Sequence, residues 1–521
     1  MATTATPAAT AAAAQMNEMI INVPVLIPGA ATMQQAQSML AAYPEFILGI
    51  GIAVIMMVDL FLPKERKVVL VWLALAVLAL TGIMSCALLA SGARGVAFTN
   101  MFVADPMANL LKIGAYVAVG VTFIYSRRYL LDRDLLTGEF VILSLFALLG
   151  IMVMISSNHF VLLYLGLELL ALSLYALVAL NRDSAVSTEA AIKYFILGAL
   201  ASGLLLYGMS MVYGGTGDLD INVIAKAIAS GQAKKPMVLF GLVFIVAGLA
   251  FKLGVVPFHM WIPDVYHGAP TAMTLMIGAA PKLAGFAIAI RILVNGLSGV
   301  AADWQSMLII LAVLSMGLGN LAAIAQTNLK RMLAYSTISH MGFMLLGLLS
   351  GVVDGNRLNA VDAYSASLFY AITYVITTLA SFGVILLMAR KAFQADNIDD
   401  FRGLNTRNPW FAWMTLIVMF SLAGSPPTVG FYAKFAVLSA AVAANMVWLA
   451  VVAVLFSLIG AFYYLRIVKV MFMEEPTDHA PIAADSGARA LLSVNGFALL
   501  ALGLAPGGLL ALCATAMKAS I

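Results

Sequence analysis

Long runs of apolar residues alternate with short polar connections from residue 44 to residue 515. An α-helix needs roughly 20 apolar residues to cross a bilayer core about 30 Å thick. Applied along the chain, this length predicts an all-α integral membrane protein with about fourteen transmembrane helices. The predicted spans are 44–62, 67–90, 106–126, 139–157, 159–180, 189–213, 236–258, 269–294, 304–326, 332–350, 364–389, 411–440, 446–472 and 490–515.

Two of these spans are interrupted by proline. The seventh reads AGLAFKLGVVPFHMW, in which Pro257 follows Lys252, and the twelfth reads SLAGSPPTVGFYAKF, in which Pro426 and Pro427 precede Lys434. Proline removes a backbone donor and clashes with the preceding turn, so it breaks a helix. Non-helical backbone at membrane depth persists only inside protein or beside water. Two broken helices five spans apart predict two inverted five-helix repeats.

This pattern divides the chain into four parts. Residues 1–40 are rich in Ala and Thr, but the first basic residue is Lys64, so the positive region of a signal peptide is missing. We expect these residues to form a lead or a short capping segment. The four parts are the lead with helices 1–3 in 1–137, the first repeat with helices 4–8 in 138–294, the inverted second repeat with helices 9–13 in 304–473, and a loop with helix 14 in 474–521.

Basic residues in the short loops predict the orientation. Lys and Arg gather in the odd-numbered loops, as in Lys64–Lys67, Arg127–Arg133 and Arg390–Arg407, and are few in the even-numbered loops. Since such residues accumulate on the cytoplasmic side, both termini are expected on the outer side of the membrane. Lys234 and Lys235, in an even-numbered loop, run against this bias.

The composition indicates a lipid environment and argues against several classes of function. Of 521 residues, 63% are hydrophobic and 10% are charged, against about a quarter charged in soluble domains. The mean hydropathy is +1.02. The two cysteines, Cys86 and Cys513, form no CxxC pair, so the chain cannot ligate an iron–sulfur cluster or a structural zinc. Basic residues do not cluster with aromatic ones, which speaks against nucleic-acid binding.

Ionisable residues inside the predicted spans point to ion translocation. A charge at the bilayer centre costs roughly 2.5–3.5 kcal/mol on insertion scales, so several in one chain indicate a function. We interpret them as protonatable groups linked by water, in which moving one charge changes how tightly the next lysine holds its proton. They are Lys112, Lys193, Lys252, Lys282, Arg291 and Lys434, together with the acid Glu168.

Each of these residues also has a structural interpretation. Lys112 and Arg291 lie near span ends, where a long side chain snorkels to the surface. Lys193 is expected to pair with Glu168, either to handle protons or only as a structural ion pair. Lys252, Lys282 and Lys434 are deep, which favours the proton relay.

Histidine is the side chain whose charge changes near neutral pH, so His259 and His340 are candidate relay residues. Both could instead be satisfied packing histidines. A b-type haem held by these two histidines is conceivable but disfavoured. No metal or cofactor site is predicted in this chain, because it has neither a G-x-G-x-x-G turn nor a phosphate-binding loop. Energy for pumping must therefore come from a partner or from another ion gradient.

The run KLGVVPFHMWIPDVYHGAPT, followed by Lys282, resembles the antiporter-like membrane subunits of respiratory complex I, the bacterial proton-pumping NADH–quinone oxidoreductase. Supporting runs are EAAIKYFILGALASGLLLYGMSM, QTNLKRMLAYSTISHMGFMLLGL and SLAGSPPTVGFYAKF, and the resemblance covers residues 40–515. In the sister subunit M a glutamate typically stands where this chain has Lys434. The lateral helix of subunit L has no room after residue 473. The resemblance is therefore to the remaining antiporter-like type.

The resemblance implies a proton relay through Glu168, Lys193, Lys252, Lys282 and Lys434. It also implies that FMN, iron–sulfur clusters and quinone are bound by partner subunits, that other membrane-arm subunits and lipid surround the chain, and that it resides in a bacterial inner membrane. Two alternatives stay open. One is a subunit of a multi-subunit cation/proton antiporter, and the other is a scaffold whose buried lysines tolerate apolar replacement.

Overall fold

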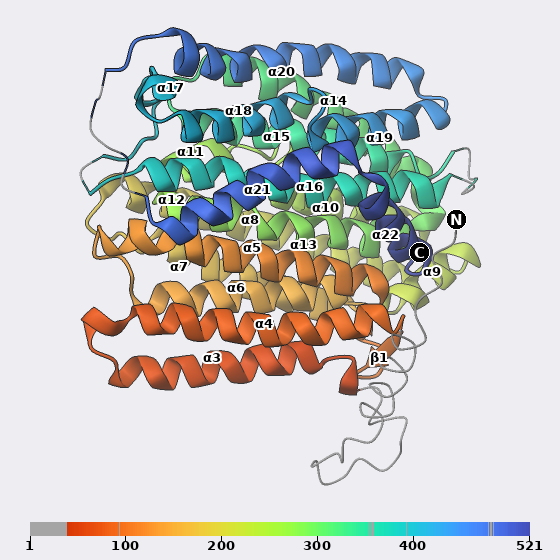
Figure 1. The fold of residues 1–521 in the computed structure, drawn as a ribbon. Coiled ribbons are helices and arrows are strands. Elements are labelled where there is room, and N and C mark those ends of the chain that lie inside the picture. The colour runs from red at the N-terminus through yellow and green to blue at the C-terminus, as the bar shows by residue number, and fades with distance from the viewer. Residues whose placement is uncertain are drawn as a thin grey trace, which may run out of the picture.

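The computed structural model describes residues 39–92, 94–353, 356, 359–391, 393–477, 479, 482 and 484–521. All but the end of the predicted lead 1–40 lies outside the described residues. The described chain is a bundle of helices that run roughly side by side, with α3 and α4 along one edge and α20 along the opposite edge (Figure 1). The predicted all-α membrane fold is confirmed.

Long apolar helices form most of the predicted spans. Within the described residues, thirteen segments are long and apolar enough to cross a membrane. Twelve of them are built on α3 (Tyr43–Phe61), α4 (Val68–Ala90), α5 (Pro106–Leu131), α6 (Gly138–Ser156), α7 (Phe160–Val178), α8 (Ala185–Thr216), α10 (Lys235–Leu253), α14 (Ala301–Ile324), α15 (Leu329–Leu349), α16 (Ala360–Met388), α20 (Val447–Met473) and α21 (Ser486–Leu504).

The remaining two spans are composite. The eighth consists of α12 (Thr271–Gly278), α13 (Ala280–Ala289) and the π-helix η2 (Ile290–Gly296). The twelfth consists of α18 (Pro409–Ala423) and α19 (Val429–Ala443), each too short to cross a bilayer alone. Counted in this way, the spans agree with the predicted number of about fourteen.

Short elements connect or extend the spans. Among the described residues the only sheet is a hairpin between α4 and α5, in which Gly95 of β1 is opposite Ala104 of β2. The short elements are β1 (Gly95–Ala97), β2 (Phe102–Ala104), η1 (Lys64–Arg66), α9 (Ile221–Ala229), α11 (Trp261–Gly268), η3 (Ser298–Val300), η4 (Ile398–Phe401), α17 (Leu404–Arg407) and α22 (Gly507–Lys518).

Two interruptions were not predicted. The eighth span bends at Ala279, between α12 and α13, and the last span is divided before α22 at Pro506. Proline is a sequence signal for both, because Pro281 follows the first bend and Pro506 lies at the second. The predicted breaks at Pro257 and at Pro426–Pro427 are confirmed, since no helix includes these residues.

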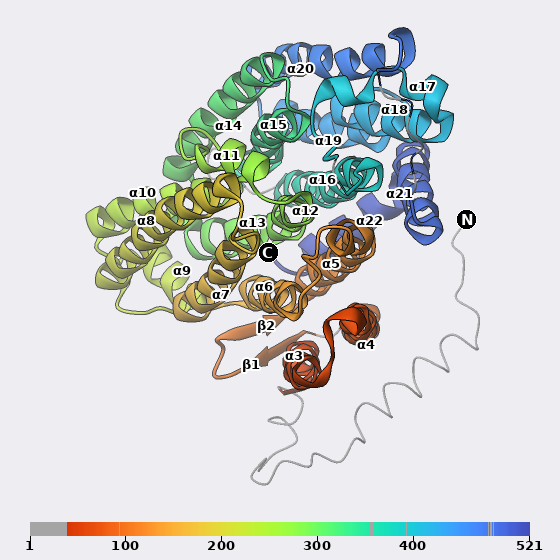
Figure 2. The same cartoon turned by 90° about the vertical axis from the view of Figure 1, so that its left-hand side faces the viewer.

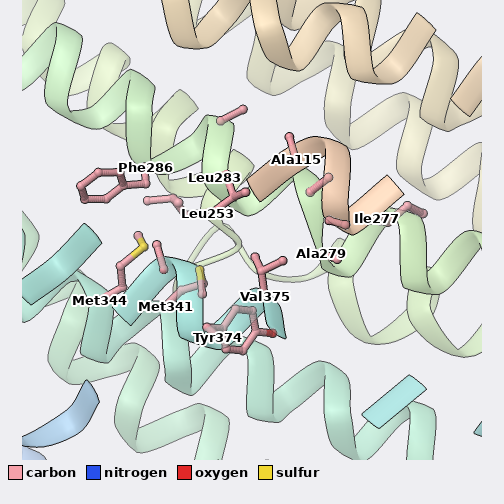
Figure 3. Packing of buried hydrophobic residues seen from close by; sticks show 14 of the residues in the cluster. Ala115, Leu253, Ile277, Ala279, Leu283, Phe286, Met341, Met344, Tyr374 and Val375 are labelled. Atoms are coloured by element: carbon pink, nitrogen blue, oxygen red, sulfur yellow. The ribbon is translucent and has the colours of Figure 1, made fainter. Parts of the chain in front are cut away.

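The interior of the bundle is formed by a few central helices. Figure 2 shows α16 in the middle, with α12, α13, α15 and α5 around it. In the most apolar window of the spans 271–296 and of α15, 94% of residues are buried, against 33% for α3, α4, α20 and α21. The outer helices therefore offer their apolar faces to lipid or to other subunits. Figure 3 shows where α5, α13, α15 and α16 meet, with Ala115, Leu283, Met341 and Tyr374 in one apolar layer.

Small residues bring some helices into backbone contact. A Cβ placed on Gly208 of α8 would lie 2.7 Å from the carbonyl oxygen of Gly241 in α10, and one on Gly241 would lie 2.6 Å from that of Gly208. Such small-residue contacts are a common way to pack helices in membranes, where the hydrophobic effect does not drive association. They fix α10, and with it the first broken helix, against α8.

Candidate functional site: lysines at the broken helices

The first broken helix stops at Leu253 and resumes at Trp261. Gly254 ends α10 in the left-handed conformation, with a φ of +80° that glycine adopts without steric cost. The last carbonyls of a helix have no partner within it. Here Lys282 Nζ donates to the carbonyl oxygen of Leu253 at 2.9 Å, and Trp261 Nε1 donates to that of Phe251 at 3.0 Å. The break is therefore satisfied from the following helix and from its own second half.

The second broken helix has the same plan. Gly424 ends α18 with a φ of +81°. Lys434 of α19 donates through Nζ to the carbonyl oxygens of Ala423 at 2.8 Å and Leu422 at 3.3 Å, and to Ser457 Oγ at 2.9 Å. A positive charge is favoured at the C-terminal end of a helix, where the helix dipole is negative. Both breaks therefore place an ammonium group at a helix end inside the membrane region.

Neither of these lysines is neutralised by a carboxylate in the part of the chain that the structure describes. Lys282 is 1% exposed and Lys434 is 8% exposed. Their other close neighbours are aromatic rings, with Lys282 Nζ 5.7 Å from the centre of the Trp261 ring and Lys434 Nζ 5.0 Å from that of Phe343. Since carbonyls and rings offer only partial charges, the proton on each lysine is sensitive to any full charge that moves nearby.

Lys252 belongs to the first break as well. It lies two residues before Gly254, and it lines a cavity of about 20 Å³ together with Lys282, Tyr194 and Trp261. That volume is enough for one water molecule. Lys252 and Lys282 thus line one space that is large enough for a water molecule.

The predicted pair of Glu168 with Lys193 is not formed. Glu168 of α7 acts electrostatically on Lys252 instead, and its Oε1 is buried with no hydrogen-bond partner among the described residues. The Lys193 ammonium pairs with Glu189 at 2.8 Å and with Asp264 of α11 at 2.9 Å, and its side chain is 44% exposed. Lys193 is thus paired at the partly exposed surface of α8 and not with Glu168. The spacing of Glu189, four residues before Lys193, was an available signal.

The snorkelling predicted for Lys112 and Arg291 is wrong. The Lys112 side chain is 0% exposed and pairs with Glu45 at 2.5 Å. The Arg291 side chain is 3% exposed and pairs through Nη1 with Asp105 Oδ2 at 2.7 Å. Both carboxylates lie at or just before the start of a helix, Glu45 in α3 and Asp105 before α5. The hydrophobic pattern placed Lys112 and Arg291 near span ends, and it gave no sign of the carboxylates that pair with them.

His340 has the geometry of a relay group. Its Nδ1 lies 2.6 Å from the hydroxyl of Tyr370 and its Nε2 lies 3.2 Å from that of Tyr464, which in turn is 2.5 Å from Ser336 Oγ. Because both ring nitrogens already have hydroxyl partners, the haem interpretation loses its second ligand. A cavity of about 10 Å³ separates His340 and Tyr370 from the second break, where Ser421 and Gly430 line it.

The other candidates are less connected. His259, in the first break, is half-buried, and its Nδ1 has no partner among the described residues. Pro257, Pro426 and Pro427 are exposed on this chain, so both breaks reach its surface. No three His, Cys, Asp or Glu side chains of the described residues gather in a way that could hold a metal ion.

One buried lysine was missed by the sequence analysis. Lys330, at the start of α15, is 4% exposed and donates through Nζ to the carbonyl oxygen of Ala269 at 2.8 Å. Ala269 ends α11, the second half of the first broken helix. Arg331, the residue after Lys330, pairs with Asp264 at 2.8 Å. A polar sequence at a span boundary gives no sign that one of its side chains turns inward.

Comparison with known proteins decides the family. Residues 157–460 match the family described as NADH:quinone oxidoreductase/Mrp antiporter, TM. A relative named NADH-quinone oxidoreductase subunit N, from Herminiimonas arsenicoxydans, is 60% identical over 92% of this chain and 98% of its own length. The chain belongs to the subunit N family of NADH-quinone oxidoreductase.

Solved structures share the fold. A chain of respiratory complex I from Thermus thermophilus, solved with bound aureothin, is 33% identical with a TM-score of 0.76, over 90% of this chain and 99% of that one. A chain of the Mrp complex from a Dietzia species has a TM-score of 0.79 at 22% identity, over 94% and 97%, and shows only that the fold is shared. The resemblance found in the sequence is confirmed, including the choice of the remaining antiporter-like type.

Proposed function

We propose that this N-type subunit carries protons across the membrane through Glu168, Lys252, Lys282, His340 and Lys434. The observation that carries the proposal is the placement of Lys282 and Lys434 on the carbonyl ends of two broken helices, with no neutralising carboxylate among the described residues. A lysine held in this way keeps a proton by partial charges alone. It is therefore able to load and release that proton when a neighbouring charge changes.

The order of events follows from the neighbours of each group. Glu168 acts on Lys252, and the water-sized cavity connects Lys252 to Lys282. Two unit charges 4 Å apart interact by about 4 kcal/mol at an effective dielectric constant of 20, which corresponds to roughly three powers of ten in a proton equilibrium. Movement of charge near Glu168 thus shifts the proton on Lys252 and, through it, the proton on Lys282.

His340 supplies the step towards Lys434. With Tyr370 on Nδ1 and Tyr464 on Nε2, the ring accepts a proton on one side while it gives one up on the other. The cavity between His340 and the second break provides the remaining water position. Lys193 takes part as the electrostatic anchor of Asp264 on α11, and His259 as a contact with water in the break.

The chemistry that drives pumping lies in partner subunits. This chain has no predicted site for a redox group, so FMN, iron–sulfur clusters and quinone are bound by other subunits of complex I. Neighbouring antiporter-like and small hydrophobic membrane-arm subunits cover the exposed apolar helices, with lipid over the rest. We place the chain in a bacterial inner membrane, with both termini on the periplasmic side, as the basic loops favour.

Two inverted repeats, 138–294 and 304–473, account for the paired breaks. Both breaks hold a left-handed glycine followed three residues later by proline, Gly254 with Pro257 and Gly424 with Pro427. The two are the seventh and twelfth spans, five positions apart, so the broken helices cross the bundle in opposite directions. Glycine precedes proline along the chain in both breaks. The two repeats differ in the direction in which their helices cross the membrane.

The test uses the assembled oxidoreductase in sealed vesicles. Lys252→Ala and Glu168→Ala are expected to lower the protons pumped per NADH oxidised, while the complex still assembles. Lys469→Ala is the matched control, because that side chain is 65% exposed on α20. Normal stoichiometry in both relay variants would disprove the relay. A purified complex that is inert to NADH but exchanges cations for protons would instead support the antiporter alternative.

A further inference from the structure

A second group of buried charges lies outside the lysine chain, where α5 begins. Asp105 caps the start of α5, and Asn109 and Lys112 follow it at spacings of four and three residues, so that these two lie on one face of the helix. All three are at most 3% exposed. Glu45 of α3 pairs with Lys112, and Arg291 of η2 pairs with Asp105. We call these five residues the α5 cluster.

The cluster has polar atoms that the protein leaves without partners. Glu45 Oε2, both amide atoms of Asn109 and Arg291 Nη2 are buried and have no hydrogen-bond partner among the described residues. Buried polar atoms in native proteins are almost always bonded to protein or to ordered water. Four such atoms in one cluster point to bound water, since a buried water typically makes about three hydrogen bonds.

Stability alone does not explain these charges. Replacing a buried ion pair by apolar groups of similar volume is often neutral or stabilising, because the charges must be taken out of water. Lys112 nevertheless lies fully buried, with its ammonium 4.9 Å from the centre of the Phe102 ring. In a membrane helix, an ionisable residue of this kind is by default a functional candidate.

The cluster is also next to the lysine chain. A Cβ on Gly114, two residues after Lys112, would lie 3.1 Å from Cδ1 of Leu283, the residue after Lys282. Figure 3 shows the neighbouring Ala115 of α5 near Leu283 of α13. Arg291 continues from α13 through η2. The helix that carries most of the α5 cluster therefore packs directly against the helix that carries Lys282.

We propose that the α5 cluster is a water-binding proton-release site, which takes protons that leave Lys282 and delivers them to the side of the membrane on which α5 begins. The inference rests on the proposed function of the lysine chain. Lys282 gives a proton to water, the Glu45 carboxylate accepts it beside Lys112, and Glu45 then returns it to water near the hairpin. Arg291 pairs with Asp105, and this ion pair forms the far end of the water path.

The experiment measures protons pumped per NADH oxidised by the assembled oxidoreductase in vesicles. Glu45→Gln is expected to lose as much of this ratio as Lys282→Met. The double variant Glu45→Gln with Lys112→Met carries no unpaired buried charge, so it should assemble and keep the low ratio. The control is Asp59→Asn with Lys67→Met, a pair at 2.5 Å between α3 and the residue before α4, whose side chains are 20% and 16% exposed.

Recovery of the normal ratio in the double variant would overturn the inference, because the pair would then serve only structure. Failure of the double variant to assemble would overturn it as well. A normal ratio in Glu45→Gln beside a low ratio in Lys282→Met would remove the release site and leave the lysine chain standing. A normal ratio in both would remove the proposed function itself.

Discussion

At the first broken helix the carbonyl oxygen that ends α10 is bound by Lys282 of the following span, whereas at the second the carbonyl that ends α18 is bound by Lys434 of the same span. The backbone solution is alike, with a left-handed glycine at each helix end. The first break adds Lys252 and Glu168 around its lysine, while the second adds the hydroxyl of Ser457 and, across a small cavity, His340. One backbone design thus supports a lysine with a second lysine and a carboxylate in one place, and a lysine with a histidine in the other.

The largest expected effect comes from removing the two lysines. Lys282→Met and Lys434→Met delete a proton-carrying group, which typically costs 10²-fold or more in a transfer rate. Lys282→Arg and Lys434→Arg keep the charge and the bond to the helix end, yet arginine does not release its proton. All four variants should therefore lose pumping, as measured by NADH-driven acidification of inverted vesicles. Normal pumping in the arginine variants would mean that both lysines only bind the carbonyls at the helix ends and do not carry protons.

Replacing the glycine at each helix end is expected to affect the two breaks differently. An L-residue in the left-handed conformation costs roughly 1–2 kcal/mol, so Gly254→Ala and Gly424→Ala should both lower the melting temperature of the complex. At Gly424 the new Cβ would lie 2.7 Å from Lys434 Cδ and 3.2 Å from its Nζ, while at Gly254 it first meets the apolar Ile262 and lies 3.8 Å from Lys282 Nζ. We expect Gly424→Ala also to lower pumping and Gly254→Ala to affect it less. Equal pumping defects would contradict this distinction.

The smallest effect is expected at Trp261, which has no equivalent at the second break. Trp261→Phe removes the bond to the carbonyl of Phe251, at a cost of about 1 kcal/mol, because the net value of such a hydrogen bond is small. Trp304→Phe is the control, since Trp304 Nε1 makes the same kind of bond to Leu297 at 3.1 Å away from both breaks. Calorimetry of the complex should show similar shifts in melting temperature. A much larger loss for Trp261 would give its ring a role in holding Lys282.

Much of the fold followed from the sequence, because span length and proline are local signals. The breaks at Pro257 and Pro426–Pro427, and the deep position of Lys282 and Lys434, are as predicted. The wrong expectations concern which residues the buried charges contact. A hydrophobic pattern gives the depth of a side chain but not the direction it faces.

Lys193 and Lys330 illustrate this limit. Both lie about one turn or less from a span end, yet Lys193 faces outward to Asp264 and Lys330 turns inward to Ala269. The direction is set by where α11 returns after the break, which depends on contacts distant in sequence. The same is true of Lys112, whose partner Glu45 comes from another helix.

The bend at Ala279 lies three residues before Lys282 and divides α12 from α13. Because the span is divided, α12 and α13 are able to move separately. If α13 slides along its axis while α12 stays in place, Lys282 leaves the carbonyl of Leu253 without any change in α10. The first break is then open to mechanical control from a neighbouring span, whereas the second, which carries its own lysine, opens only if the broken helix itself bends.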